Sequence, residues 1–186
     1  MPYFIFDQDT QRADIPVLGH LPAGVDELDV IGGKSLAYPN LPLTATLAPW
    51  RGDLFLPDAI TYLIPLVSDK VKAVFESAGI DNVQYFPVQL LHPSSGAVVA
   101  SYWLTIVLGL LDAIDRDRST GKLHKVLKIY RWRSIVIDDS RARGLDLFRV
   151  VDKRQLMIIS ERLKVQLEAA ALSGVRIRAT QDYDGS

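Results

Sequence analysis

Acidic side chains are closely spaced in the segment LDAIDRDRS, residues 111–119. Two carboxylates such as Asp112 and Asp115 could share acid–base work or hold a cation. Arg116 and Arg118 are interleaved with them and can neutralise their charge, and no histidine or nucleophile is close in sequence. We therefore expect a capped or ion-paired turn, and we rank an enzyme built on Asp112 and Asp115 last among the hypotheses.

Other signals of cofactor or metal chemistry are weak. Residues 32–35 read GGKS, like the end of a phosphate-binding loop, but the full motif needs a glycine where the chain has Leu28. We expect a plain turn there. The chain has no cysteine, and its histidines show no ligand spacing (His20, His92 and His124). We therefore expect no cofactor, no metal and no catalytic residues.

Basic residues surround two aromatic residues in the segment 122–134. They are Lys122, Lys125, Lys128, Arg131 and Arg133, around Tyr130 and Trp132. Such a mixture can bind phosphates and stack bases, and Trp, Tyr and Arg are also enriched among the anchors of protein interfaces. A half-buried strand whose arginine stems pack on a sheet gives the same pattern. Our candidate partner-binding residues are Lys128, Tyr130, Arg131, Trp132 and Arg133, with the loop 138–144 beside them.

Charge is unevenly distributed along the 186 residues, although the formal net charge is only −1. Residues 1–60 hold eight acids and three bases, whereas residues 116–178 hold sixteen bases and seven acids. This asymmetry indicates either a face for a charged partner or two halves that neutralise each other in the fold. No basic segment followed by an apolar one opens the chain, so we expect a cytoplasmic protein.

One segment is written twice, which gives the strongest structural prediction. Residues 67–88 (VSDKVKAVFESAGIDNVQYFPV) align with residues 159–180 (ISERLKVQLEAAALSGVRIRAT) at a constant offset of 92. Ser68 and Ser160 are good helix N-caps, and an apolar helical face follows each. Gly79 can end the first helix in the left-handed conformation, whereas the second, with Ala171 there, is expected to run on towards Gly174. A short strand should follow each helix, at 83–90 and 175–179.

The remaining elements predict an α+β fold with a largely antiparallel sheet and two main helices in repeated helix–strand units. We expect strands at Pro2–Phe6, at Val98–Leu111 (turning helical near Leu108–Ile114), at Lys125–Ile137, at Leu145–Val151 and at Leu156–Ile159. Six prolines between residues 14 and 58 argue against helices and long ladders there. We expect a single domain over residues 1–186, with an irregular Pro-rich N-terminal arm (1–58), an α+β core (59–180) and a tail (181–186).

Three blocks together resemble a known family. They are residues 66–90, 101–119 and 147–177, and the matching positions are Ser68, Gly79, Pro87, Tyr102, Asp112, Asp115, Ser119, Phe148, Ser160 and Gly174. The chain resembles the bacterial immunity proteins of polymorphic-toxin systems, family eleven. It departs from the family pattern at Thr105, where asparagine is typical, and at Ala171, where glycine is typical. The resemblance implies that the protein binds one cognate toxin and blocks it.

We therefore expect an immunity protein that neutralises a cognate bacterial protein toxin by occlusion, without catalysis. The alternative is a nucleic-acid-binding module that uses the basic and aromatic segment 122–134. Nucleic acid is the less favoured partner and no membrane is expected, while a homodimer is left open. The longest apolar run, Val98–Leu111, is shorter than the ~20 residues that a membrane span needs.

Overall fold

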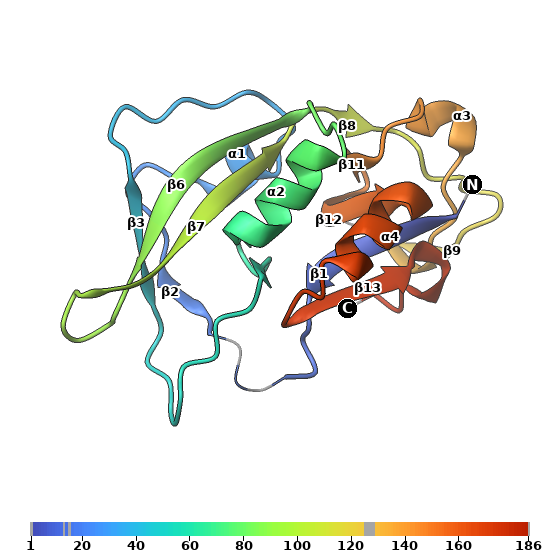
Figure 1. Ribbon diagram of the computed structural model, residues 1–186. Helices are drawn as coiled ribbons and strands as arrows, with labels where there is room; N and C mark the ends of the chain where they lie inside the picture. Colours follow the sequence, from blue (N-terminus) through green and yellow to red (C-terminus); the bar gives the residue numbers. More distant parts are fainter. Residues whose placement is uncertain (1, 13, 15, 125–128, 186) are drawn as a thin grey trace.

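The fold is α+β and mostly β, with two curled sheets of mixed strand direction and a separate hairpin (Figure 1). The computed structural model describes residues 2–12, 14, 16–124 and 129–185. Within these ranges it has four α-helices: α1 (Glu27–Val30), α2 (Asp69–Ser77), α3 (Asp139–Ala142) and α4 (Glu161–Ala169). A 3-10 turn, η1 (Thr180–Asp182), follows the last strand.

The larger sheet has six strands in the order β2-β3-β6-β7-β5-β4. They are β2 (Leu18–His20), β3 (Leu43–Leu47), β6 (Val83–Leu91), β7 (Val98–Val107), β5 (Leu66–Val67) and β4 (Ala59–Ile60). All neighbouring pairs are antiparallel except β3 and β6, which run parallel.

The second sheet has five strands in the order β13-β1-β12-β11-β8. They are β13 (Val175–Ala179), β1 (Tyr3–Gln8), β12 (Lys153–Ser160), β11 (Leu147–Val150) and β8 (Leu110–Leu111). Only β11 and β8 pair in parallel. The third group is the antiparallel hairpin of β9 (Thr120–His124) and β10 (Ile129–Ser134).

Helices α2 and α4 lie side by side where the two large sheets meet (Figure 1). Their bounds differ by 92 residues, the offset between the two similar segments, and the Ser68 and Ser160 hydroxyls cap them by accepting from the backbone N–H groups of Val71 and Leu163. A hydrophobic cluster beneath the helices contains Phe75 and Leu167 from their buried faces and strand residues from both sheets. This shared cluster joins the two sheets.

The expectation that α4 runs on towards Gly174 is wrong. Helix α4 ends at Ala169, and Ala171 takes a left-handed backbone conformation with φ of +49°. Gly79 holds the equivalent place after α2, with φ of +75°. Ala171 therefore ends its helix as a glycine would, at a conformational cost of about 1–2 kcal/mol for a residue with a side chain.

The strands around the two helices pair in the same register. Leu66 of β5 and Phe86 of β6 both lie opposite Leu104 of β7. At the offset of 92, Ile158 of β12 and Arg178 of β13 both lie opposite Ile5 of β1. The central strand of one set, β7, follows its helix in the chain, whereas β1 is the first strand of the chain.

The N-terminal segment is more regular than the predicted irregular arm of residues 1–58. Besides β1 it contributes β2, α1 and β3, and β3 runs along β6 from Leu43, opposite Val88, to Thr46, opposite Leu91. The reason is local: Leu43, Ala45 and Leu47 alternate with more exposed residues, so β3 has a buried face. The prolines confine the ladder to this short stretch.

The apolar run 98–111 also departs from expectation at its end. Strand β7 stops at Val107, and no helix forms near Leu108–Ile114, all of which the structure describes. Gly109 takes φ of +86°, and its N–H donates to the Gly33 carbonyl oxygen at 2.7 Å. Leu110–Leu111 then joins the other sheet as β8. The GGKS segment is a turn packed on this crossing, because a Cβ on Gly33 would lie 2.9 Å from the Gly109 carbonyl carbon.

Candidate protein-binding surface

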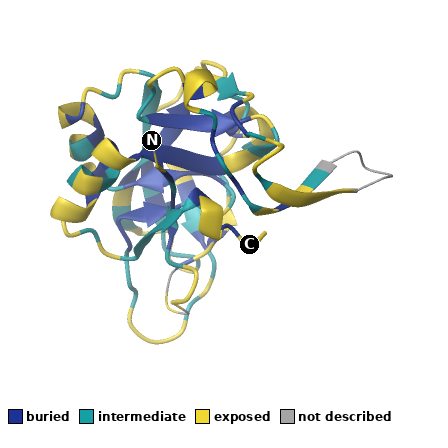
Figure 2. Ribbon diagram, turned by 90° about the vertical axis from the view of Figure 1, so that its right-hand side faces the viewer, coloured by how far each residue is buried: buried dark blue, intermediate teal, exposed yellow. Residues whose placement is uncertain are grey.

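The β9–β10 hairpin contains most of the candidate binding residues. Figure 2 shows its described part leaving the body of the molecule at the right of the view. In the register of the hairpin, Tyr130 lies opposite Leu123 and Arg131 lies opposite Lys122. Side chains alternate between the two faces of a strand. The hairpin therefore has an apolar face and a basic face.

Trp132 holds the apolar face against the body. Its side chain is only 2% exposed and belongs to a buried cluster that includes Leu156 and Tyr183. The rings of Tyr130 and Trp132 stack with centroids 4.5 Å apart and planes 9° apart. Gly121, opposite Trp132, makes room for the indole, because a Cβ there would lie 2.8 Å from the Trp132 Cε3 atom. Trp132 thus acts as a support from beneath, and a partner has little access to it.

The basic face is open to solvent. Lys122, Arg131 and Arg133 are all exposed, and none of the three forms an ion pair with a residue that the structure describes. Lys122 and Arg131 lie directly opposite each other in the ladder. Like charges in that position destabilise a hairpin, by up to about 1 kcal/mol. The free protein therefore holds positive charge at a place where an acidic partner would relieve the repulsion.

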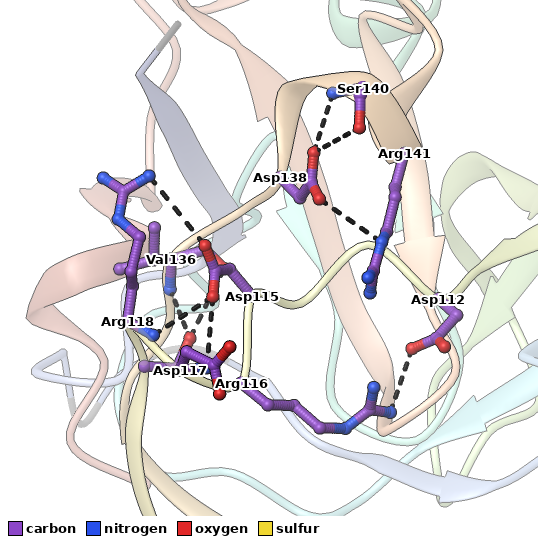
Figure 3. A network of polar contacts seen from close by, with 10 residues as sticks. Asp112, Asp115, Arg116, Asp117, Arg118, Val136, Asp138, Ser140 and Arg141 are labelled. Atoms are coloured by element: carbon purple, nitrogen blue, oxygen red, sulfur yellow. Dashed lines mark hydrogen bonds and ion pairs between the residues drawn. The ribbon is translucent and has the colours of Figure 1, made fainter.

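Polar contacts fix the base of the hairpin (Figure 3). The Asp115 N–H donates to the Val136 carbonyl oxygen at 2.9 Å, and the Val136 N–H donates to the Ser119 hydroxyl oxygen at 2.9 Å. The Asp115 carboxylate accepts from the N–H groups of Asp117 and Arg118, each at 3.1 Å. These bonds tie the segment entering β9 to the segment leaving β10. The hairpin is therefore presented from a well-connected base.

Asp112 and Asp138, two other acids of this region, are also paired, as expected for a capped or ion-paired turn. Arg116 bridges Asp112 at 2.9 Å and Asp152 at 3.0 Å, and the bond from Asp112 raises the pKa of Arg116 above its ordinary value. Asp138 caps α3 and binds Arg141, and its hydrogen bond to the Ser140 hydroxyl lowers the Asp138 pKa. The Asp112 carboxylate thus binds Arg116, whereas the Asp115 carboxylate binds the backbone N–H groups of Asp117 and Arg118 (Figure 3).

The five predicted contact residues have different environments. Arg131 and Arg133 are exposed, Tyr130 is half-buried and Trp132 is buried, while Lys128 lies outside the described residues. Sequence reasoning missed Leu123, which is 45% exposed beside Tyr130, and the pairing of Lys122 with Arg131. The hairpin register reveals both, whereas the pattern of residue types does not.

Other chemistry finds little support in the described part of the chain. No group of three or more His, Asp or Glu side chains there could hold a metal ion. Among the helices of the same residues, none has the length and apolar character to cross a membrane.

A comparison with protein families gives the class its name. Residues 6–182 match the model of the immunity protein family Imm11. The match spans nearly the whole chain, so the protein belongs to the Imm11 immunity protein family, as the sequence resemblance indicated. A comparison with curated proteins finds no match. Membership of this family indicates a toxin-neutralising role.

Proposed function

We propose that the protein binds one cognate bacterial toxin in the cytoplasm and blocks it by occlusion, without catalysis of its own. The β9–β10 hairpin is the docking element. Lys122, Arg131 and Arg133 meet an acidic face of the toxin, and Leu123 and Tyr130 add apolar contact at the open end of the other face. Lys128 remains a predicted contact.

One observation supports this proposal most strongly: Lys122 and Arg131 oppose each other on an exposed ladder and have no acidic partner among the described residues. Surface cations elsewhere in the protein are commonly paired, for example Arg12 with Asp14 at 2.7 Å. Acidic groups of a partner would turn a repulsive pair into an attractive cluster. Complementary charge also speeds encounter and excludes wrong partners.

The rest of the fold serves as a rigid framework in this proposal. Helices α2 and α4, with the strands that pair around them in equivalent registers, form two helix–strand units that share a core. A preformed interface needs little ordering on binding, which preserves affinity. A standard interface buries about 1,600 Å² in total, more than one hairpin offers. The segment 138–144 at its base, which contains α3 and not the loop expected from the sequence, is the proposed extension.

Charge reversal on the hairpin tests the proposal. The double variant Arg131→Glu/Arg133→Glu should fold, because the glutamate introduced at position 131 would lie opposite Lys122 and replace a repulsive pair with an attractive one worth about 0.2–1 kcal/mol. Loss of toxin binding in that variant could then not be ascribed to unfolding. Lys34→Glu/Arg51→Glu is the matched control, since both residues are exposed or half-exposed and far from the hairpin in sequence.

The assay is growth of cells that co-express the toxin encoded by the neighbouring gene. The wild-type protein and the control should restore growth and co-purify with the toxin, whereas the hairpin variant should do neither. Close charge pairs across an interface contribute about 1.5–7 kcal/mol, so reversing two of them should weaken binding at least ~100-fold. Equal rescue by the hairpin variant would show that the hairpin is not the docking element. Failure of the wild-type protein to restore growth would show that the product of the neighbouring gene is not its cognate toxin.

A second candidate function uses the same three cations. Lys122, Arg131 and Arg133 could track a phosphate backbone while Tyr130 stacks on a base. Binding of this kind weakens steeply with salt because counterions are released. A gel-shift series at about 50 and 200 mM salt separates the two functions: three phosphate contacts predict that affinity for nucleic acid falls about 20- to 40-fold, and such a fall would favour the second.

A further inference from the structure

A cavity lies beside the five-stranded sheet. Its lining includes Leu156 and Tyr183, which also belong to the cluster that buries Trp132. Its volume is about 540 Å³, within the usual range for small-molecule sites. The loop between β4 and β5 (Thr61–Pro65) forms one wall, and the adjoining ends of β1 and β12 form another. Gln8 fastens this loop to β1, because its side-chain oxygen accepts from the N–H groups of Thr61 at 2.8 Å and Tyr62 at 3.0 Å.

Arg149 of β11 lines this cavity and is almost wholly buried, with 1% of its surface exposed. Only one end of its guanidinium is satisfied: Nη1 donates to the carbonyl oxygens of Arg154 at 2.6 Å and Gln155 at 2.9 Å. Nε has no hydrogen-bond partner among the described residues, and neither Nε nor Nη2 donates in any bond there. The donors of Nη2 are thus unused, whereas Nε is enclosed by protein atoms.

The charge of Arg149 also lacks a counter-ion. No described acid lies within ion-pair distance of it, and burial alone lowers its pKa to about 10. The side chain therefore stays protonated at neutral pH. The cavity contains two acids, but Asp7 is engaged by the Thr61 hydroxyl and the Gln8 N–H, and Glu27 lies on α1 across the opening. A buried charge without a partner is strongly destabilising, so binding of an anion here would stabilise the protein.

The rest of the lining favours a ligand with an apolar body. Ile31, Leu63, Pro65, Leu156 and Met157 contribute apolar surface, and Lys153 adds a second cation. Leu63 takes φ of +72°, an unfavourable conformation for a branched side chain, which the surrounding loop holds in place. The cavity therefore combines an anion-binding end with a hydrophobic wall.

We propose that this cavity binds a small organic carboxylate, with the carboxylate accepting a hydrogen bond from Nη2 of Arg149 and the apolar part against Leu63 and Met157. A hydrogen bond between a guanidinium and a carboxylate is charge-assisted and roughly twice as strong as one between neutral groups. The cavity adjoins the support of the β9–β10 hairpin through Tyr183, but none of the described hairpin residues lines it, so it is a ligand site in addition to the toxin-binding surface. Its existence does not depend on the proposed immunity role.

Titration of the purified protein with hexanoate tests the proposal. Hexanol is the control for chain length without the carboxylate, and sodium chloride is the control for ionic strength. Binding is measured by calorimetry and by the midpoint of thermal unfolding, Tm. Hexanoate should raise Tm by about 3–6 °C for each tenfold excess over its Kd, and the other two probes should not. No binding of hexanoate, or equal stabilisation by hexanol, would overturn the proposal.

Two variants locate the site. Arg149→Met keeps much of the length of the side chain but removes its donors and should abolish the response to hexanoate, whereas the neighbouring Arg154→Met, on an exposed side chain, should leave it unchanged. Lys153→Glu places a negative charge at the cavity without altering Arg149 and should weaken binding about tenfold. Should Arg149→Met not fold, Lys153→Glu decides, and hexanoate binding that is unaffected by it would place the ligand elsewhere.

Discussion

Replacing Trp132 by alanine gives the clearest test of how the hairpin is held. The side chain is 2% exposed, and a buried tryptophan removes about 150–250 Å² from water. At about 25 cal/mol per Å² this corresponds to roughly 4–6 kcal/mol, and loss of the stack on Tyr130 adds about 0.5–1.5 kcal/mol. Measured truncations of large aromatic side chains cost about 3–5 kcal/mol, which is the loss in unfolding free energy that we expect.

The indole nitrogen makes a second variant informative. Trp132 Nε1 is buried and has no hydrogen-bond partner among the described residues. A buried donor without a partner costs about 1–3 kcal/mol. Trp132→Phe removes that donor but keeps most of the apolar contact, so it should lose about 1 kcal/mol or less.

Urea unfolding at neutral pH measures both variants, and the slope of the transition shows whether each variant unfolds in one cooperative step. Toxin binding is then measured under conditions where both are folded, and Trp132→Phe should bind as the wild type does. A loss below about 1 kcal/mol for Trp132→Ala, far under the usual range for such truncations, would refute the supporting role of the indole. Weak toxin binding by a fully stable Trp132→Phe would show that the indole itself contacts the partner.

Three further predictions concern the framework. Ala171→Gly should stabilise the protein by about 0.5–1 kcal/mol and Gly79→Ala should destabilise it by about 1 kcal/mol in chemical denaturation, because both residues are left-handed; opposite signs would contradict the assigned helix ends. The hydrogen bond from Arg162, with that from the Ser160 hydroxyl, lowers the pKa of Asp146, so this carboxylate stabilises the fold above its unfolded pKa of about 3.9 and loses its contribution as pH falls through the lower folded value. Asp146→Asn should therefore cost about 1–3 kcal/mol at neutral pH and progressively less below about pH 4, and a cost that does not depend on pH would contradict this role. The double variant Asp112→Asn/Asp115→Asn should still restore growth of toxin-expressing cells, with a slightly lower Tm. If a folded double variant did not restore growth, the hypothesis of an enzyme built on these two carboxylates would be favoured instead.

Local signals in the sequence were sufficient for the elements that depend on local chemistry. The hydroxyls of Ser68 and Ser160 cap their helices as expected, because the cap needs only the residue itself and the next turn. The strand at 175–179 has the bounds expected for it, and β1 and β6 lie within two residues of theirs. The α+β class follows from the same patterns.

Contacts between distant segments could not be predicted in this way. Ser68 and Ser160 also bind Asp58 and Asp146, which lie ten and fourteen residues earlier, and only the folded sheet brings these groups together. Ala171 gives no local signal of its left-handed conformation, because alanine is the best helix former. Just after this turn the Ser173 N–H donates to the Asp58 carboxylate at 2.7 Å, and the Asp58 N–H donates to the Ser173 carbonyl oxygen at 2.8 Å, which holds the chain in place.

The candidate site shows the same limit. Alternation along β10 predicts Tyr130 and Trp132 on one face, and their rings do stack. It also predicts Arg131 and Arg133 on the other face, but the register shifts between Trp132 and Ser134 and the ladder gives Arg133 no partner. Alternation does not show which face packs on the body, and the predicted contact Trp132 is buried. Arg149 has no distinguishing feature in the sequence, because only its position between β12 and the β4–β5 loop removes it from solvent.

The most direct test of toxin binding by the hairpin is a comparison of backbone hydrogen–deuterium exchange in the free protein and in its complex with the toxin. Peptides that cover β9 (Thr120–His124) and β10 (Ile129–Ser134) should exchange more slowly in the complex, together with the adjoining segment 138–144 that contains α3. Peptides from β2 and β3, at the far edge of the larger sheet, should exchange at the same rate in both. A stable complex that slows exchange at β2 and β3 and leaves the hairpin unchanged would contradict the account.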